Sequence, residues 1–274
     1  MKKKILSLML VLVLALAFAV PSYAHGYTYW TSSTKIGLGH FAYGETAGDS
    51  NSGTNYSLAQ RFNYHNNLFL LSLRGSFGYV PANYTGATQG GTATTGTVHY
   101  SLNNFSAGAG IDPRLMGGLM QNELYLSLGD TTHDFMAANS SFSNGVHGYD
   151  ESYQTKYLSL TYKNIYAFNP VVSNVFKADY IDGFSGTVTT KGYGEIGTIN
   201  GYPINNNLEM NLGGEKGYGI AEGVRYRLNN GVSLVGDVYY SALFLKNSNE
   251  SLAYYEPSSM THQYGVQIGV HIAF

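Results

Sequence analysis

The chain has 274 residues, of which 44% are hydrophobic and only 12% are charged, and it contains 34 Gly, 25 Tyr and no Cys. Soluble domains average about 25% charged residues and about 7% Gly, so this composition is unusual on both counts. The lack of Cys excludes a disulfide scaffold and a thiolate metal site, and the net charge of −2 excludes the basic surface that nucleic-acid binding needs.

The N-terminal residues carry the pattern of a secretory signal. Three lysines at positions 2–4 precede an apolar run over 5–20, and small residues stand at the −3 and −1 positions of a cleavage site after Ala24. A membrane-anchoring helix is the alternative, but this run is shorter than the about 20 residues that span a bilayer. We predict a signal peptide over 1–24 and one exported domain over 25–274, in which 12 basic residues face 17 acidic ones once the three lysines are removed.

Beyond residue 25 the apolar residues recur with a period of two, which is typical of β-strands. The runs have about the length that a tilted strand needs to cross a membrane. Ten strands are predicted, at Thr34–Tyr43, Asn55–Tyr64, Phe69–Val80, Val98–Ile111, Met120–Gly129, Tyr153–Tyr166, Val172–Phe184, Lys216–Leu228, Val232–Lys246 and Thr261–Phe274.

The connections between these strands alternate in length. Those after even-numbered strands are short, as at 65–67 and 229–231, whereas those after odd-numbered strands are long and polar, as at Ala82–Gly96 and Ser185–Glu215. A soluble β-sandwich also has short strands and Gly-rich turns, but it does not require this segregation. Short turns on one side and long loops on the other predict an all-β, antiparallel transmembrane β-barrel with periplasmic turns and extracellular loops.

The last predicted strand separates an apolar face from a small and polar face. The apolar face consists of Tyr264, Val266, Ile268, Val270, Ile272 and Phe274. With its terminal Phe, this strand resembles the C-terminal signal of the bacterial outer-membrane β-barrel superfamily. The resemblance implies a location in the cell outer membrane of a Gram-negative bacterium, with lipid and lipopolysaccharide around the barrel. It also implies that the barrel-insertion machinery reads this strand.

Three strands depart from strict alternation. Phe41 lies out of phase with Leu38 in the first strand, the fourth strand changes phase between Leu102 and Phe105, and Glu222 shares the parity of its apolar neighbours. A β-bulge would restore the alternation of apolar and polar residues in each strand, and bulges are common near barrel rims. One bulge is therefore expected in each of these three strands.

Most of the strand charges occupy the parity opposite the apolar residues. They are Arg61, Arg74, Glu123, Lys163, Lys177, Asp179, Arg225, Arg227 and Asp237. A charge that faces lipid at mid-depth costs about 2–4 kcal/mol, so these side chains are expected to point into the bore. They form either an internal salt-bridge network that fills the bore or a narrow basic lumen that selects anions. A ten-stranded barrel is little wider than eight-stranded barrels, whose interiors side chains fill, which favours the first interpretation.

The long loops are acidic, and a solvated surface is the expectation for them, because their acids lack the spacing of a calcium loop. One cluster, Asp130–Asp134 with His133, could activate water together with Asp182. Ten-stranded omptin proteases and smaller lipid-modifying barrels place such groups at the outer rim. The two separated acid pairs expected of omptins have no match here, so we predict no catalytic residue, no cofactor and no metal site.

The function that this sequence favours is an integral outer-membrane β-barrel with a largely filled bore. Its extracellular loops would then have a structural or surface-binding role. Two alternatives stay open. One is a small-bore, porin-like channel with a basic lumen for anions or small solutes, and the other is an omptin-like or lipid-modifying enzyme.

Overall fold

The computed structural model describes residues 28–87, 92–115, 119–145, 148–191, 198–199, 202–203, 208–249 and 255–274. The predicted signal peptide over 1–24 lies outside the described residues. Within these ranges, no helix has the length and apolar character needed to cross a membrane.

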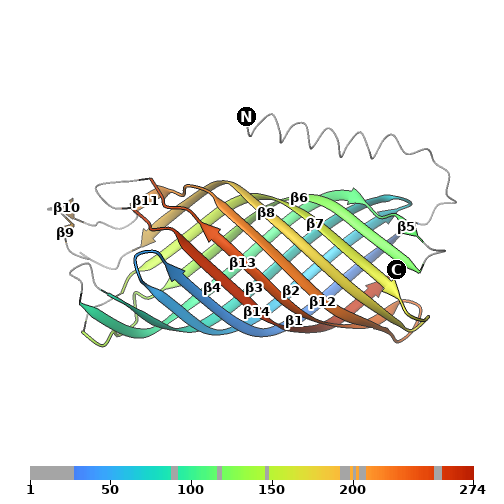
Figure 1. Ribbon diagram of the computed structural model, residues 1–274, viewed down its shortest axis with the longest axis horizontal. Coiled ribbons are helices and arrows are strands. Elements are labelled where there is room, and N and C mark those ends of the chain that lie inside the picture. Colours follow the sequence, from blue (N-terminus) through green and yellow to red (C-terminus); the bar gives the residue numbers. More distant parts are fainter. Residues whose placement is uncertain are drawn as a thin grey trace.

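Ten long antiparallel strands form a closed barrel (Figure 1). They are β1 (Thr28–Glu45), β2 (Ser50–Asn66), β3 (Phe69–Ala87), β4 (Ala93–Ile111), β6 (Met120–Met136), β7 (Asp150–Ala167), β8 (Val172–Lys191), β12 (Glu215–Arg227), β13 (Val232–Leu245) and β14 (Ser259–Ala273). The last strand, β14, pairs with β1 from Thr31–Ala273 to Glu45–Ser259 and closes the barrel. The ten predicted strands are therefore confirmed.

Four short strands complete the described structure. β5 (Arg114–Leu115) pairs with β6, and β11 (Leu208–Asn211) pairs with β8. β9 (Thr198–Ile199) and β10 (Tyr202–Pro203) pair with each other. In Figure 1, β5 and the C-terminus lie at one end of the barrel and β11 lies at the other. Following the sequence prediction, the first is called the periplasmic end and the second the extracellular end.

The short periplasmic turns follow from local side-chain chemistry. In the turn before β8, Asn169 Oδ1 accepts hydrogen bonds from the amides of residues 171 and 172, both at 2.8 Å. In the turn before β13, Asn229 Oδ1 accepts equivalent bonds from residues 231 and 232 at 2.9 Å. Asn stabilises such turns because its side chain substitutes for a backbone acceptor.

The strands extend further at the extracellular end than the sequence predicts. Most of the predicted loop Ala82–Gly96 is strand, since β3 continues to Ala87 and β4 begins at Ala93. The connection between β1 and β2 is only residues 46–49. Each strand was predicted to end where its apolar face ends. In the structure, the strands continue to pair through segments whose outward residues are polar.

The outward surface is apolar near the periplasmic end and polar beyond it. Side chains such as Ile36 and Leu73 are exposed on the apolar belt, at 59% and 49%. Further along, the outward residues of β2 and β3 are polar, for example Thr54 and Asn83. A strand needs about 9–11 residues to cross a membrane, and β8 has 20, so the strands project beyond the lipid. The described parts of 41–54, 81–103, 130–156, 184–215 and 243–260 are called the extracellular extension below.

The three predicted bulges are wrong. The pairing register runs without interruption through β1, β4 and β12. Instead, Phe41 and Leu102 turn into the barrel interior, where their exposures are 1% and 8%. Glu222 points outward, and its carboxylate accepts a hydrogen bond from the side-chain amide of Asn174. The error came from the assumption that interior positions are polar along the whole strand.

A register shift does occur elsewhere, in the pairing of β7 with β8. Lys156 pairs with Ser185 and Tyr157 pairs with Gly183, which leaves Phe184 as the extra residue of a β-bulge. The bulge reverses the parity of β8, so Val188 and Thr190 become the buried residues of its last part. β8 therefore continues into the segment that the sequence analysis assigned to a loop.

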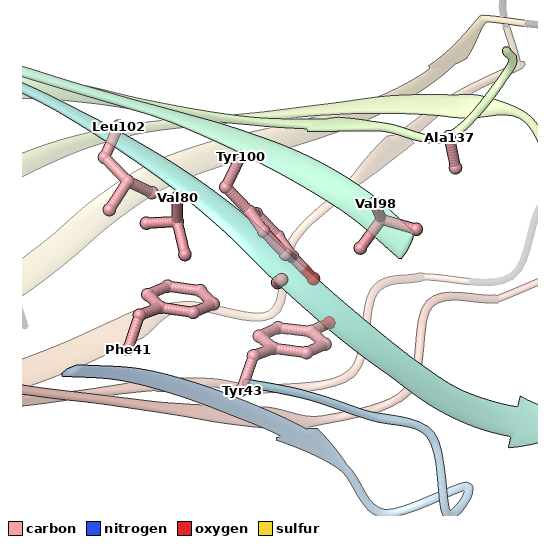
Figure 2. Packing of buried hydrophobic residues seen from close by; sticks show 8 residues of the cluster. Phe41, Tyr43, Val80, Val98, Tyr100, Leu102 and Ala137 are labelled. Carbon is pink, nitrogen blue, oxygen red and sulfur yellow. The ribbon is translucent and has the colours of Figure 1, made fainter. Parts of the chain in front are cut away.

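An apolar plug lies inside the extracellular extension, as Figure 2 shows. Its side chains come from β1, β3, β4 and the residue that follows β6, and their exposures are at most 9%. The plug consists of Phe41, Tyr43, Val80, Ala82, Val98, Tyr100, Leu102 and Ala137. The Phe41 and Tyr100 rings are 4.8 Å apart between centroids. A second buried cluster of Tyr153, Val188, Met210 and Leu245 covers the opposite wall.

Candidate functional site: the interior of the barrel

The nine charged residues singled out from the sequence all lie at the walls of two interior cavities. A central cavity of about 350 Å³ lies below the plug, and a periplasmic pocket of about 250 Å³ lies at the other end of the bore. The central cavity is lined by Arg61, Arg74, Lys163, Lys177, Asp179, Arg225 and Asp237. The periplasmic pocket is lined by Glu123 and Arg227, and it shares Lys163 and Arg225 with the central cavity.

An ion-pair layer of Arg61, Glu123 and Lys163 separates the two cavities. Lys163 Nζ donates to one oxygen of Glu123 at 2.6 Å, and Arg61 Nη2 donates to the other at 3.5 Å. The Arg61 guanidinium also lies 4.7 Å from the centroid of the Tyr125 ring, a cation–π contact. Glu123 is 1% exposed, so its carboxylate depends on these two cations for solvation.

Two further ion pairs lie on the wall of the central cavity. Lys177 pairs with Asp179, which also accepts a hydrogen bond from Thr161 Oγ1 at 2.6 Å. Lys35 of β1 pairs with Asp237 of β13. The sequence analysis did not single out Lys35, although its position on the inward parity of β1 was a signal that could have found it. Among the described residues, Arg74 has no carboxylate within 4.0 Å.

A buried histidine–carboxylate contact stabilises the wall of the periplasmic pocket. His65 Nδ1 lies 2.7 Å from Asp112 Oδ2, and Gln121 Nε2 donates to the same oxygen at 2.8 Å. The ring of Tyr29 stacks on His65 with centroids 4.4 Å apart and planes 1° apart. Sequence reasoning placed Asp112 in a turn and missed this pair, because His65 and Asp112 come from different connections.

The extracellular extension buries several of the acids that were expected to be solvated. Glu151 and Glu256 are 7% and 3% exposed, and the hydroxyl of Tyr153 lies 2.7 Å from one carboxyl and 2.6 Å from the other. Tyr43 donates to nearby Glu45 at 2.8 Å. A phenol has one proton to donate, so one of the two carboxyls at Tyr153 must be protonated. Burial and the charges of Glu151 and Glu45 raise the pKa of Glu256 to about 10.

The buried carboxyls make the extracellular extension sensitive to pH. Because the pKa of Glu256 is raised in the folded state, its contribution to stability is complete below the ordinary value of 4.5 and is lost as the pH rises towards 10. We expect amide hydrogen exchange in residues 150–156 of β7, corrected for the intrinsic rate, to accelerate from pH 5 to pH 9. The variant Glu256→Gln should suppress this acceleration. The exposed Glu209→Gln is the control, and equal pH dependence in both variants would contradict the assignment.

The possible catalytic cluster at the outer end of β6 is not assembled. His133 lines the central cavity. Asp130 and Asp134 lie on the outward parity, where they accept hydrogen bonds from Gln154 at 3.1 Å and from Ser152 at 2.6 Å. The acids and the histidine are therefore on opposite faces of the strand. In the described part of the chain, no group of three or more His, Asp and Glu residues is arranged to hold a metal ion.

The apolar residues of the C-terminal strand lie on the outer surface of the barrel. They are Tyr264, Val266, Ile268, Val270, Ile272 and Phe274, and their exposures range from 37% to 68%. The amide of Trp30 donates to the carbonyl of Phe274 at 2.8 Å, and the amide of Phe274 donates back at 3.0 Å. The end of β14 is thus paired to β1 at the seam that closes the barrel. Its role in insertion stays a prediction.

Comparison with solved structures identifies other barrels. The outer membrane protease OmpT from Escherichia coli matches with a TM-score of 0.60 and 11% identity, over 90% of this chain and 97% of that one. The translocator domain of the autotransporter NalP from Neisseria meningitidis matches with a TM-score of 0.45 and 11% identity, over 98% and 95%. No protein-family model and no curated protein matches the chain.

The fold and the outward surface together fit a membrane-spanning barrel. A closed antiparallel barrel satisfies its backbone hydrogen bonds internally, as hydrocarbon requires. The apolar belt provides the lipid-facing surface, and the similarity to OmpT extends over nearly the whole of both chains. The chain therefore has the fold of the bacterial outer-membrane β-barrels, as the location predicted from its sequence requires.

Proposed function

We propose that this barrel is closed to ions and acts through its extracellular extension, in a structural or surface-binding role. The observation that carries this proposal is the apolar plug, because eight buried side chains pack together inside the bore, where a channel would need water. The ion-pair layer obstructs the bore a second time, nearer to the periplasm.

The surface of the extension supports contacts with polar partners. Outward Ser, Thr, Asn and Asp side chains follow the upper parts of β2, β3, β6 and β7, and Asp130 and Asp134 are among them. Lipopolysaccharide would surround the barrel at the height where the belt ends. A surface ligand that carries basic or hydrogen-bonding groups would complement the acidic side chains above it. The barrel-insertion machinery is the third proposed partner, through the C-terminal strand.

Single-channel recording on the refolded protein tests the closed bore. We expect no discrete current in planar bilayers at several lipid compositions, and a steady current would contradict the proposal. The surface role is tested by replacing residues 192–207 with a short Gly-Ser linker, which leaves the paired residues of β8 and β11 in place. Binding to bacterial or host surface preparations should fall in this variant, while gel mobility before and after boiling should stay the same as in the parent. Unchanged binding would count against a role of this loop.

A small-bore channel is the second candidate, and one observation favours it. The central cavity and the periplasmic pocket share Lys163, Arg225 and His271 in their walls, so only thin partitions interrupt the lower bore. Its basic residues would select anions if the plug moved aside. Anion-selective current that falls when Arg74 or Arg225 is replaced by Ser would favour this function over the first. The opposite placement of His133 and its neighbouring acids offers no support for an enzyme.

A further inference from the structure

The periplasmic pocket contains more positive than negative charge. Lys163, Arg225 and Arg227 are in its wall, and the one carboxylate there is Glu123. That carboxylate is already shared by Lys163 and Arg61. In the described ranges, neither Arg225 nor Arg227 has a carboxylate within 4.0 Å. The pocket therefore has two guanidinium groups without a counter-charge in contact.

The second acid near the pocket does not compensate this charge. Asp112 is 1% exposed, and its Oδ2 atom already contacts His65 Nδ1 and Gln121 Nε2. The His65 ring, stacked on Tyr29, lies between this carboxyl and the pocket wall. The same contacts hold the Gln121 and Tyr29 side chains in place, so the wall opposite the arginines is pre-organised.

The Arg225 side chain has a donor that nothing in the described structure satisfies. Its Nε atom is buried and has no hydrogen-bond partner. The backbone position is constrained from both sides, because Arg225 pairs with Val235 of β13 and with Ser173 of β8. A buried donor without an acceptor is unfavourable, so an acceptor at this point would be bound with a net gain.

The shape of the pocket limits what such an acceptor can be. Its volume of about 250 Å³ is smaller than the roughly 300–1,000 Å³ typical of drug-sized ligand sites. The ion-pair layer lies between the pocket and the central cavity, so the direct approach for a ligand is from the periplasm. The remaining wall combines neutral polar groups from Thr31, Asn63 and Gln121 with apolar side chains such as Ile165 and Val171. These features fit a small, compact, hydrophilic anion.

We propose that the periplasmic pocket binds a small soluble anion with a phosphate or carboxylate group, with Arg225 and Arg227 as its charged ligands. Guanidinium groups form charge-assisted, often bidentate hydrogen bonds with both kinds of anion, and they stay charged at every physiological pH. The anion is held and not transported, because the ion-pair layer and the plug close the route outward. This inference does not depend on the extracellular extension having a partner.

The test is a titration of the refolded full barrel with inorganic phosphate in phosphatidylcholine nanodiscs, at constant ionic strength with chloride. NMR is recorded on the Gln121 side-chain amide and the His271 ring. We expect saturable shifts at both positions, and none with glycerol, a neutral molecule of similar size. Arg225→Gln should raise the Kd by about tenfold or more, which is the expected effect of losing a charge-assisted hydrogen bond.

Arg74→Gln is the matched control, because Arg74 is an inward arginine that lines only the central cavity. Its phosphate Kd should equal that of the parent. Arg227→Gln, at the exposed edge of the pocket, gives a second test if Arg225→Gln does not fold. Equal Kd values for the Arg74 and Arg225 variants, or shifts that never saturate, would overturn the proposal as non-specific binding. If phosphatidylglycerol nanodiscs gave the same saturated NMR shifts without added phosphate, the pocket would bind a lipid headgroup. That result would overturn the assignment to a soluble anion.

Discussion

Replacing Glu123 by Ala is expected to lower the free energy of unfolding of the barrel by about 3–5 kcal/mol. The carboxylate is almost completely buried and is the counter-charge of both Lys163 and Arg61. Without it, two largely buried cations remain between the two cavities with no counter-charge in contact. Breaking one partner of a buried pair is costly because the remaining charge cannot regain its hydration.

Urea unfolding in lipid vesicles measures this loss, with the fluorescence of Trp30, the one Trp of the chain, as the signal. The matched control is Asp237→Ala, which breaks the pair with Lys35, whose side chain is 27% exposed. We expect the control to lose about 1 kcal/mol, since a partly hydrated lysine recovers solvent contacts. The double variant Glu123→Ala with Lys163→Met should recover part of the stability. Equal losses in the two single variants would show that the layer is hydrated.

Replacing Phe41 by Ala is expected to lower the free energy of unfolding of the barrel by about 3–5 kcal/mol. Phe41 is 1% exposed and packs against Tyr100 in the centre of the plug. The substitution removes apolar contacts and leaves a cavity that the rigid strand backbones cannot close. Vesicle unfolding of the refolded variant measures the loss.

Leu38→Ala on the same strand is the control for this prediction. Leu38 faces lipid and is 52% exposed in the structure. Leu38→Ala should lower the free energy of unfolding by about 1–2 kcal/mol. Acyl chains fill the vacated space, so no additional cost arises from a cavity. If Phe41→Ala costs no more than Leu38→Ala, Phe41 does not lie in a packed interior. The bore would then be open at the plug, and the closed-barrel proposal would lose its main support.

Much of the architecture was predictable because lipid imposes a simple rule on one face of each strand. All ten long strands were located, and the outward positions of residues such as Leu73 and Val266 followed from alternation alone. Arg61 and Glu123 were assigned to the interior for the same reason, since a charge in lipid is unfavourable at either position. Their pairing could not be read, because partners inside a barrel lie on strands that are far apart in the chain.

The errors share a cause. Inward residues were expected to be polar, so Phe41 and Leu102 were explained by bulges instead of an interior plug. Strands were expected to end with the lipid, so the acids near Glu151 were assigned to a solvated rim. The bulge at Phe184 had no signal in the apolar pattern, because the polar residues that follow it alternate without a marked face.

Alternation along the chain was enough to predict the strand number and the orientation of each strand face. Each residue that faces lipid must be apolar, so the sequence shows a local pattern with a period of two. The contents of the interior became visible only in the folded barrel: a plug, an ion-pair layer and a pocket with two uncompensated arginines. Those features depend on contacts across the bore, which the closure of β14 onto β1 creates and which no local pattern records.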